Sequence, residues 1–387
     1  MRITEIRDIV VPIKSSISNA FISFAEMTVS AIAVHTDAVR DGKPVIGYGF
    51  HSNGRYAQQG ILRERIIPRL LGAAPESLLN AEGRNLDPEK AWRVMMTNEK
   101  PGGHGDRSVA VGAMDMALWD ATAKIEGKPL YRLLADRYRN GETDESVSVY
   151  AAGGYYYPGK DVGTLVDEMR SYLDLGYTTV KIKIGGASLA EDLERIEAVL
   201  KLLASGDRLC VDANGRFDAV TALQYAQALN PYGLRWYEEP GDPLDFDLLA
   251  QVALASTTPI ATGENLFAMP EARNLIRYGG LDSKEDFLQM DPALSYGIVE
   301  YVRTLDMLRE HSWSSRRCIP HGGHQMALHI AAGLGLGGNE SYPGVFLPFG
   351  GFADEAPIEE GRVRLPDVPG IGIELNSDLY ELFRTIS

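Results

Sequence analysis

The sequence predicts an α/β protein in which a closed barrel of parallel strands follows a smaller α+β region. From about residue 145 onward, strand-like and helix-like segments alternate regularly through seven units, and residues 338–346 can supply a closing strand. Sequential units in that number close into a barrel rather than form an open sheet. The first 55 or so residues instead have the pattern of antiparallel strands.

The first third of the chain supplies a small sheet followed by helices. Strands are expected at 3–13, 27–35 and 45–50, with Asp41-Gly42 as a hairpin turn. Helical periodicity covers 58–71, 88–97 and 108–125, and Ser108 is expected to cap the last of these helices. Residues 15–24 are too many for a tight turn, so they form either a functional lid or a surface loop of no consequence.

The alternating region resolves into elements of ordinary length. Strands are expected at 146–151, 179–184, 208–212, 234–239, 259–264, 287–291 and 317–321. Helices are expected at 161–175, 189–204, 219–229, 246–255, 269–278, 298–310 and 326–334. The tail, 352–387, loses the alternation and is expected to pack back on the first region.

Composition excludes several classes of protein. No apolar run approaches the roughly 20 residues of a membrane span, and the charged N-terminus does not suit a signal peptide. A net charge of −15 argues against general nucleic-acid binding. Cys210 and Cys318 lie far apart in apolar contexts, which favours reduced, buried thiols and a cytoplasmic protein.

Two lysines stand on the strand expected at 179–184. Side chains alternate along a strand, so Lys181 and Lys183 share one face and the apolar residues between them share the other. If the apolar face packs against helices, both ammonium groups face the barrel interior, where burial and mutual repulsion would lower their pKa values. The alternative is an edge strand with a solvated lysine face.

Three acids close successive strands of the barrel. Asp212, Glu238 and Glu264 follow one another at intervals of 26 residues. Carboxyl ends of barrel strands meet at one face, where three carboxylates form a site for a hard cation such as Mg²⁺. Asn214 and Glu239 lie near enough to be supporting or alternative ligands. The competing interpretation is three unrelated acids that cap helices or pair with arginines.

Asp291 and His321 end the next two strands. A carboxylate beside a histidine fixes its tautomer and raises its basicity, which makes a pair for proton transfer. His324 is either functional or a helix cap. The remaining histidines considered are interpreted as structural: His35, His51, His311 and His329.

A metal beside proton-transfer groups indicates chemistry at a carbon next to a carboxylate. The proton of such a carbon leaves only when the developing enediolate is stabilised, and a divalent cation bound to the carboxylate does this. No P-loop, GxSxG elbow or complete dinucleotide-binding fingerprint is present to indicate another chemistry.

Short motifs along the chain resemble the enolase superfamily, in its mandelate racemase branch. They are GYG (47–49), AMDMALWD (113–120), KIK (181–183), DANG (212–215), EEP (238–240), TGEN (262–265), DP (291–292) and PH (320–321). The resemblance implies a (β/α)₇β modified TIM barrel (131–350) and an α+β capping domain formed by 1–130 and completed by 351–387. It also implies Mg²⁺ on Asp212, Glu238 and Glu264.

The resemblance further implies roles for individual residues. Lys183 would be the base with Lys181 beside it, and His321–Asp291 would act on the opposite face of the substrate. Candidates for substrate binding are Glu340, Asn19, Lys100, His104 and Tyr156, although a solvated loop is the alternative for Asn19, Lys100 and His104.

The activity that the resemblance implies is dehydration of a sugar diacid, D-tartrate to oxaloacetate, by a homo-oligomer in the cytoplasm. The partner would be a small sugar acid or dicarboxylate, with no nucleic acid or membrane involved. Dehydration of another acid sugar, racemisation or epimerisation of a 2-hydroxy acid, and a non-catalytic barrel remain as alternatives.

Overall fold

The computed structural model describes residues 1–13, 15–157 and 159–387. An antiparallel sheet, in the order β1-β2-β3, opens the chain and consists of β1 (Ile3–Pro12), β2 (Thr28–Arg40) and β3 (Lys43–Phe50). Asp41 and Gly42 join β2 to β3, and both have positive φ (50° and 76°), as a two-residue hairpin turn requires. The predicted hairpin is therefore confirmed.

Helices follow this sheet in the chain, and the longest of them packs against it. They are α1 (Gln59–Ile61), the π-helical turn η1 (Leu62–Ile66), α2 (Ile67–Gly72), α3 (Pro88–Met95), α4 (Asp106–Glu126) and α5 (Leu130–Tyr138). The long helix α4 lies so close to β3 that a Cβ on Gly47 would stand 2.1 Å from the Ala117 carbonyl oxygen. Ser108 does not cap α4, because the helix begins two residues earlier and the Ser108 hydroxyl donates to the Gly105 carbonyl (2.5 Å).

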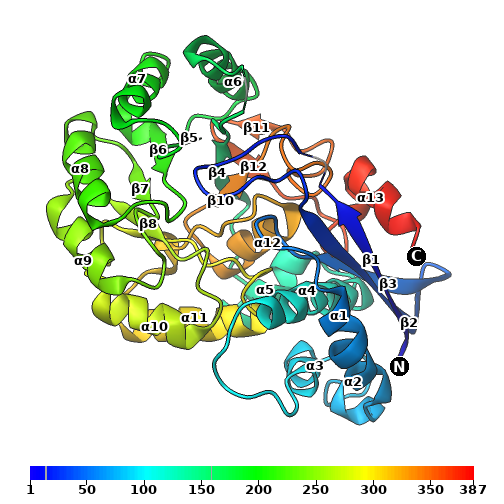
Figure 1. The fold of residues 1–387 in the computed structure, drawn as a ribbon. Coiled ribbons are helices and arrows are strands. Elements are labelled where there is room, and N and C mark those ends of the chain that lie inside the picture. Colours follow the sequence, from blue (N-terminus) through cyan, green and yellow to red (C-terminus); the bar gives the residue numbers. More distant parts are fainter. Residues whose placement is uncertain (14, 158) are drawn as a thin grey trace.

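The barrel follows, with its strands ringed by helices (Figure 1). Its parallel strands run in the order β4 to β9: β4 (Ser146–Ala152), β5 (Val180–Lys183), β6 (Leu209–Asp212), β7 (Trp236–Glu238), β8 (Ile260–Thr262) and β9 (Phe287–Leu288). Its helices are α6 (Val162–Asp174), α7 (Leu189–Leu200), α8 (Ala219–Leu229), α9 (Phe246–Ala255), α10 (Met269–Tyr278), α11 (Ile298–Glu310) and α12 (Gln325–Leu334).

The barrel closes between β9 and β4. The strand expected at 317–321 is reduced to a parallel bridge between Leu288 and Cys318, since Pro320 has no N–H to extend the ladder. β10 (Asn339–Ser341) then pairs in parallel with β4. Seven strand positions, each followed by a helix, and a closing strand give the (β/α)₇β arrangement among the described residues.

The C-terminal tail contacts both parts of the molecule. β11 (Ile358–Glu359) and β12 (Arg362–Arg364) extend the barrel sheet by antiparallel pairing of β12 with β4. α13 (Ser377–Arg384) lies beside the antiparallel sheet (Figure 1), and the hydroxyl groups of Tyr48 and Ser387 are 2.7 Å apart. Within the described ranges, no helix is both long and apolar enough to cross a membrane.

Candidate active site

Three carboxylates meet at the carboxyl ends of neighbouring barrel strands. Asp212 ends β6, Glu238 ends β7 directly opposite it, and Glu264 follows β8 by two residues. Each can offer an oxygen so that the three atoms lie within 4.8 Å of one another. Such a set of oxygen donors suits a hard divalent cation.

The electrostatics of this group also fit a cation. Burial and the charge of Asp212 raise the pKa of Glu238 to about 8, against the opposing effect of Lys181. A buried carboxylate with so high a pKa lacks enough nearby positive charge, which a divalent cation would supply. Asn214 supports the site, since its backbone N–H donates to Asp212 Oδ1 (2.8 Å). Glu239 is held by the Asn265 amide, which donates to both carboxylate oxygens (2.8 and 2.9 Å).

Both lysines of β5 are buried and paired with acids. Lys181 Nζ lies 2.6 Å from Glu238 Oε1 and 2.7 Å from Glu340 Oε1, while Lys183 pairs with Asp212 on the adjacent strand. The expectation of lowered lysine pKa values is wrong for this structure. Burial does act to lower the two pKa values, but the surrounding carboxylates outweigh it and raise them. For Lys183, the attraction of Asp212 also outweighs the repulsion by Lys181.

His321 is held by Asp291 at the same end of the barrel. Its Nδ1 lies 2.9 Å from Asp291 Oδ2, and its Nε2 lies 4.0 Å from Glu264 Oε2. Burial acts to lower the pKa of His321, but Glu264 and Asp291 raise it to about 9. The two carboxylates thus favour the protonated ring, an imidazolium, which can donate a proton.

His324 is the helix cap that the sequence allowed. Its Nδ1 accepts the backbone N–H of Ala327 at the start of α12 (3.2 Å), and its Nε2 contacts Ser52 Oγ (2.8 Å). The histidines interpreted as structural do not line the cavity described next: His35, His51, His311 and His329.

A cavity of about 290 Å³ brings the chemistry-bearing residues together with the N-terminal region. Barrel residues on its wall include Lys183, Asn214, Glu239, Glu264, Asn265, His321 and Tyr342. N-terminal residues on its wall include Asn19, Phe21, Ile22, Phe24, Met27, Asn53 and Arg55. The segment 15–24 therefore covers the site, and Asn19 lines the cavity.

The other residues predicted to bind substrate take different positions. Glu340 does not line the cavity but pairs with Lys181, and its carboxylate accepts the Tyr342 hydroxyl (2.8 Å). Neither Lys100 nor His104 lines the cavity, and the His104 ring contacts the Tyr296 hydroxyl (3.1 Å).

Tyr156 also lies outside the cavity wall, because its hydroxyl donates to Asp192 (2.6 Å) on α7, whereas the adjacent Tyr155 lines the cavity. These placements depend on tertiary contacts that no local pattern reveals.

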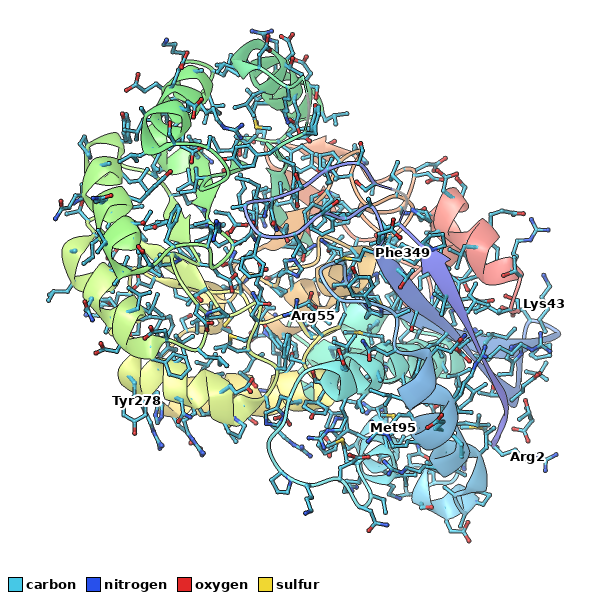
Figure 2. The ribbon with its side chains drawn as sticks, in the orientation of Figure 1. Arg2, Lys43, Arg55, Met95, Tyr278 and Phe349 are labelled. Atoms are coloured by element: carbon cyan, nitrogen blue, oxygen red, sulfur yellow. The ribbon has the colours of Figure 1, made fainter. Side chains whose placement is uncertain are left out.

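Arg55 is a cavity residue that sequence reasoning missed. Figure 2 labels it near the middle of the view, whereas Arg2 and Lys43 lie at the edge. Its guanidinium donates to Gly54 O (2.6 Å) and Asn265 Oδ1 and stacks 4.9 Å from the Phe267 ring centroid. No carboxylate of the described ranges pairs with it. The available signal was a lone cation in the polar segment 51–55 directly after β3.

Family models match most of the chain. Residues 3–135 match the mandelate racemase / muconate lactonizing enzyme N-terminal domain, and residues 164–379 match the enolase C-terminal domain-like family. The chain belongs to the enolase superfamily. The predicted family, its mandelate racemase branch and the modified TIM barrel with a capping domain are thereby confirmed.

Known members of the superfamily align over nearly the full length. The L-talarate/galactarate dehydratase of Salmonella typhimurium is 29% identical over 94% of this chain and 86% of its own length. The arabinonate dehydratase of Saccharolobus solfataricus is 29% identical over 83% and 82%, respectively.

Solved structures of the superfamily are also similar. A magnesium-bound racemase from Streptomyces coelicolor superposes with a TM-score of 0.79, at 26% identity over 99% of both chains. L-Talarate dehydratase from Polaromonas, complexed with Mg and L-glucarate, gives 0.74 at 28% identity over 98% of this chain and 96% of that one.

Proposed function

We propose that this protein is a Mg²⁺-dependent sugar-acid dehydratase, a hydro-lyase, whose substrate is the four-carbon diacid D-tartrate. The observation that carries the proposal is that Lys183 and His321 line one cavity beside three clustered carboxylates. That combination offers a base, an acid and a cation site around a single small ligand. Dehydratases of acid sugars among the similar proteins support the reaction class.

The residues divide the work of the reaction. Mg²⁺ held by Asp212, Glu238 and Glu264 would supply the positive charge that stabilises an enediolate. Although burial acts to lower the pKa of Lys183, the charge of Asp212 raises it, and a cation held by Asp212 would offset that charge. As the free amine, Lys183 then takes the proton from the carbon next to the bound carboxylate. His321, oriented by Asp291, gives a proton to the β-hydroxyl, which leaves as water. The resulting enol converts to its keto form, so D-tartrate yields oxaloacetate and water.

Arg55 supports a substrate with two carboxylates. In the proposed reaction, one carboxylate of the substrate lies beside the cation and Lys183. The second carboxylate of a diacid therefore needs another positive partner in the cavity. Arg55 is cationic, lines the cavity and has no carboxylate partner among the described residues. A guanidinium binds a carboxylate through two parallel hydrogen bonds, and Arg55 retains N–H groups beyond those already donated. It replaces Lys100 and His104 as our candidate for this role.

Two reasons favour D-tartrate over other diacids as the substrate. The overall sequence, including residues 155–157 and 339–341, resembles D-tartrate dehydratase. A cavity of about 290 Å³ also suits a short acid. The main competitors are a longer acid sugar and, because proton-transfer groups are placed on two sides in this proposal, racemisation of a 2-hydroxy acid.

A screen of acid sugars tests the proposal. The protein is supplied with Mg²⁺ and, separately, D-, L- and meso-tartrate, galactarate, L-talarate, arabinonate, galactonate and gluconate, and release of 2-keto acid is measured. We expect oxaloacetate from D-tartrate and none after chelation of the metal. Turnover of a different acid instead would show that D-tartrate is not the substrate. A change of configuration without release of keto acid would show that the protein is a racemase and not a dehydratase.

A further inference from the structure

Tyr156 attaches the lid segment 15–24 to the barrel. Its backbone N–H donates to Ser18 O (2.9 Å), and its carbonyl oxygen accepts both the N–H and the hydroxyl of Ser18 (3.0 and 2.9 Å). Figure 1 shows this segment, in blue, reaching from β1 and β2 toward the region of β4 and β10. Among the described residues, Tyr156 makes the hydrogen bonds that tie this segment to the barrel, and Phe24 adds apolar packing on Tyr155 and Phe346.

The side chain of Tyr156 reaches the turn that follows Lys183. Its hydroxyl donates to Asp192 Oδ1 (2.6 Å) and lies 3.2 Å from the carbonyl oxygen of Lys183. The other oxygen of Asp192, which is fully buried, accepts the Gly185 N–H (2.6 Å) and the Tyr225 hydroxyl (2.8 Å). Asp192 thus holds the backbone two residues after Lys183.

Two further contacts tighten this arrangement. Arg195 donates to Lys183 O (3.2 Å) and Gly154 O (2.7 Å), and its guanidinium lies 4.2 Å from the centre of the Tyr156 ring. The ring also presses on Gly186, where a Cβ would stand 2.5 Å from a ring carbon. Both the carbonyl of Lys183 and the turn beyond it are consequently held by groups that contact Tyr156.

We propose that Tyr156 is a positioning residue that couples the seating of the segment 15–24 to the placement of Lys183. Tyr156 does not line the cavity, so it acts through the backbone on either side of it rather than on the substrate. Coupling of this kind is reciprocal: a seated segment steadies the lysine, and a steady lysine strand favours the seated segment. The functional consequence rests on the proposed function, in which Lys183 takes the proton.

A hydroxyl-only substitution separates coupling from simple packing. Tyr156→Phe keeps the ring, its contact with Arg195 and the backbone pair with Ser18, but removes the donor to Asp192. Tyr225→Phe is the matched control, because it removes the other hydroxyl from the same carboxylate. Among the described residues, no hydrogen bond joins Tyr225 to the segment 15–24 or to Lys183.

The first measurement is amide hydrogen exchange with Mg²⁺ and no substrate. Tyr156→Phe should accelerate exchange about tenfold in peptides that cover both 15–24 and 184–186. Tyr225→Phe should leave 15–24 at the native rate. Equal rates for 15–24 in the two variants would overturn the coupling. If Tyr156→Phe does not fold, Ser18→Ala tests the coupling from the segment 15–24, because it removes the hydroxyl that donates to Tyr156 O. An unchanged exchange rate at 184–186 in that variant would also overturn the coupling.

The second measurement is kinetic. Tyr156→Phe should lower kcat about tenfold and leave KM within about twofold, because a displaced base slows the chemical step more than binding. Tyr225→Phe should change both less, and equal losses in the two variants contradict a positioning role. If the native protein turns over no acid sugar, the proposed function fails, while the substrate-free exchange rates still decide the coupling.

Discussion

The Nζ atom of Lys181 lies 2.6 Å from Glu238 Oε1, inside the group of carboxylates that forms the cation site. The same ammonium lies 2.7 Å from Glu340 Oε1 and 3.5 Å from Asp212 Oδ2, so one lysine serves three buried acids. Its charge is not enough, because the pKa of Glu238 stays raised to about 8 by burial and by Asp212. The raised pKa of Glu238 therefore indicates that additional positive charge would be stabilised at these strand ends.

The first prediction is that Glu238→Gln keeps the fold and removes nearly all metal-dependent turnover. A neutral amide removes one ligand charge, and a cation contributes several kcal/mol of charge stabilisation, so kcat should fall by about 10³-fold or more. Metal content and turnover at increasing Mg²⁺ measure the effect.

Trp236→Phe is the control for that substitution. It removes the indole N–H that donates to Glu238 Oε2 (2.7 Å) but leaves the carboxylate in place. Metal should still bind, with a loss of at most about 10² in affinity. Full activity of the native protein after metal removal would show that the three carboxylates are not a catalytic cation site.

The second prediction concerns Arg55 and the choice between diacids and monoacids. Arg55→Met should reduce kcat/KM for a diacid by about 10- to 100-fold, because hydrogen bonds to a charged group contribute about 1.5–3 kcal/mol. Activity on a monoacid, where measurable, should change little. Arg55→Lys keeps the charge but cannot make two parallel hydrogen bonds. Its kcat/KM for a diacid should therefore lie between the values of the native protein and of Arg55→Met. Equal losses on both kinds of acid would make Arg55 a structural residue.

The third prediction is a pH effect on stability at a site far from the cation. His329 on α12 is buried, and burial lowers its pKa to about 3 from an unfolded value of 6.5. Below pH 6.5 the unfolded chain takes up a proton that the folded chain refuses, so folding becomes less favourable as the pH falls toward 3.

The non-titrating variant His329→Gln lacks this penalty. The free energy of unfolding of the native protein should fall relative to that of the variant by about 1.4 kcal/mol per pH unit below 6.5. Urea unfolding at several pH values between about 4.5 and 7.5 measures the difference. A difference that does not depend on pH would show that His329 is charged in the folded state as well.

Local patterns predicted the barrel and its acids because both depend on position within a repeating unit. Asp212 and Glu238 end adjacent strands in register, so the interval of 26 residues already placed them together. The same reasoning failed where placement depends on tertiary contacts. Lys100 and His104 belong to a loop before α4, and the neighbouring Arg107 binds the Tyr296 hydroxyl (2.8 Å), which keeps that loop away from the cavity.

Electrostatic expectations failed for a related reason. The two lysines of β5 are close in sequence, so their mutual repulsion was visible. The pairing of Lys183 with Asp212, and of Lys181 with Glu238 and Glu340, depends on side-chain geometry that the sequence does not show. The helix α5 was also absent from the predicted elements.

The last prediction separates the two proton-transfer roles. Lys183→Ala removes the base, so both elimination and exchange of the α proton with solvent deuterium should vanish. His321→Asn leaves the base and the cation site but removes the acid for the leaving hydroxyl. Because an unprotonated hydroxide is a poor leaving group, elimination should fall by about 10² or more.

In His321→Asn the α proton can still leave to Lys183, which can return a deuteron to the same face. This variant should therefore retain α exchange with little keto acid, as followed by NMR in D₂O. His324→Asn is the control, since His324 caps α12 and does not line the cavity, so its ratio of exchange to elimination should match the native value. If Lys183→Ala exchanges the α proton and His321→Asn does not, the base and the acid have been assigned the wrong way round.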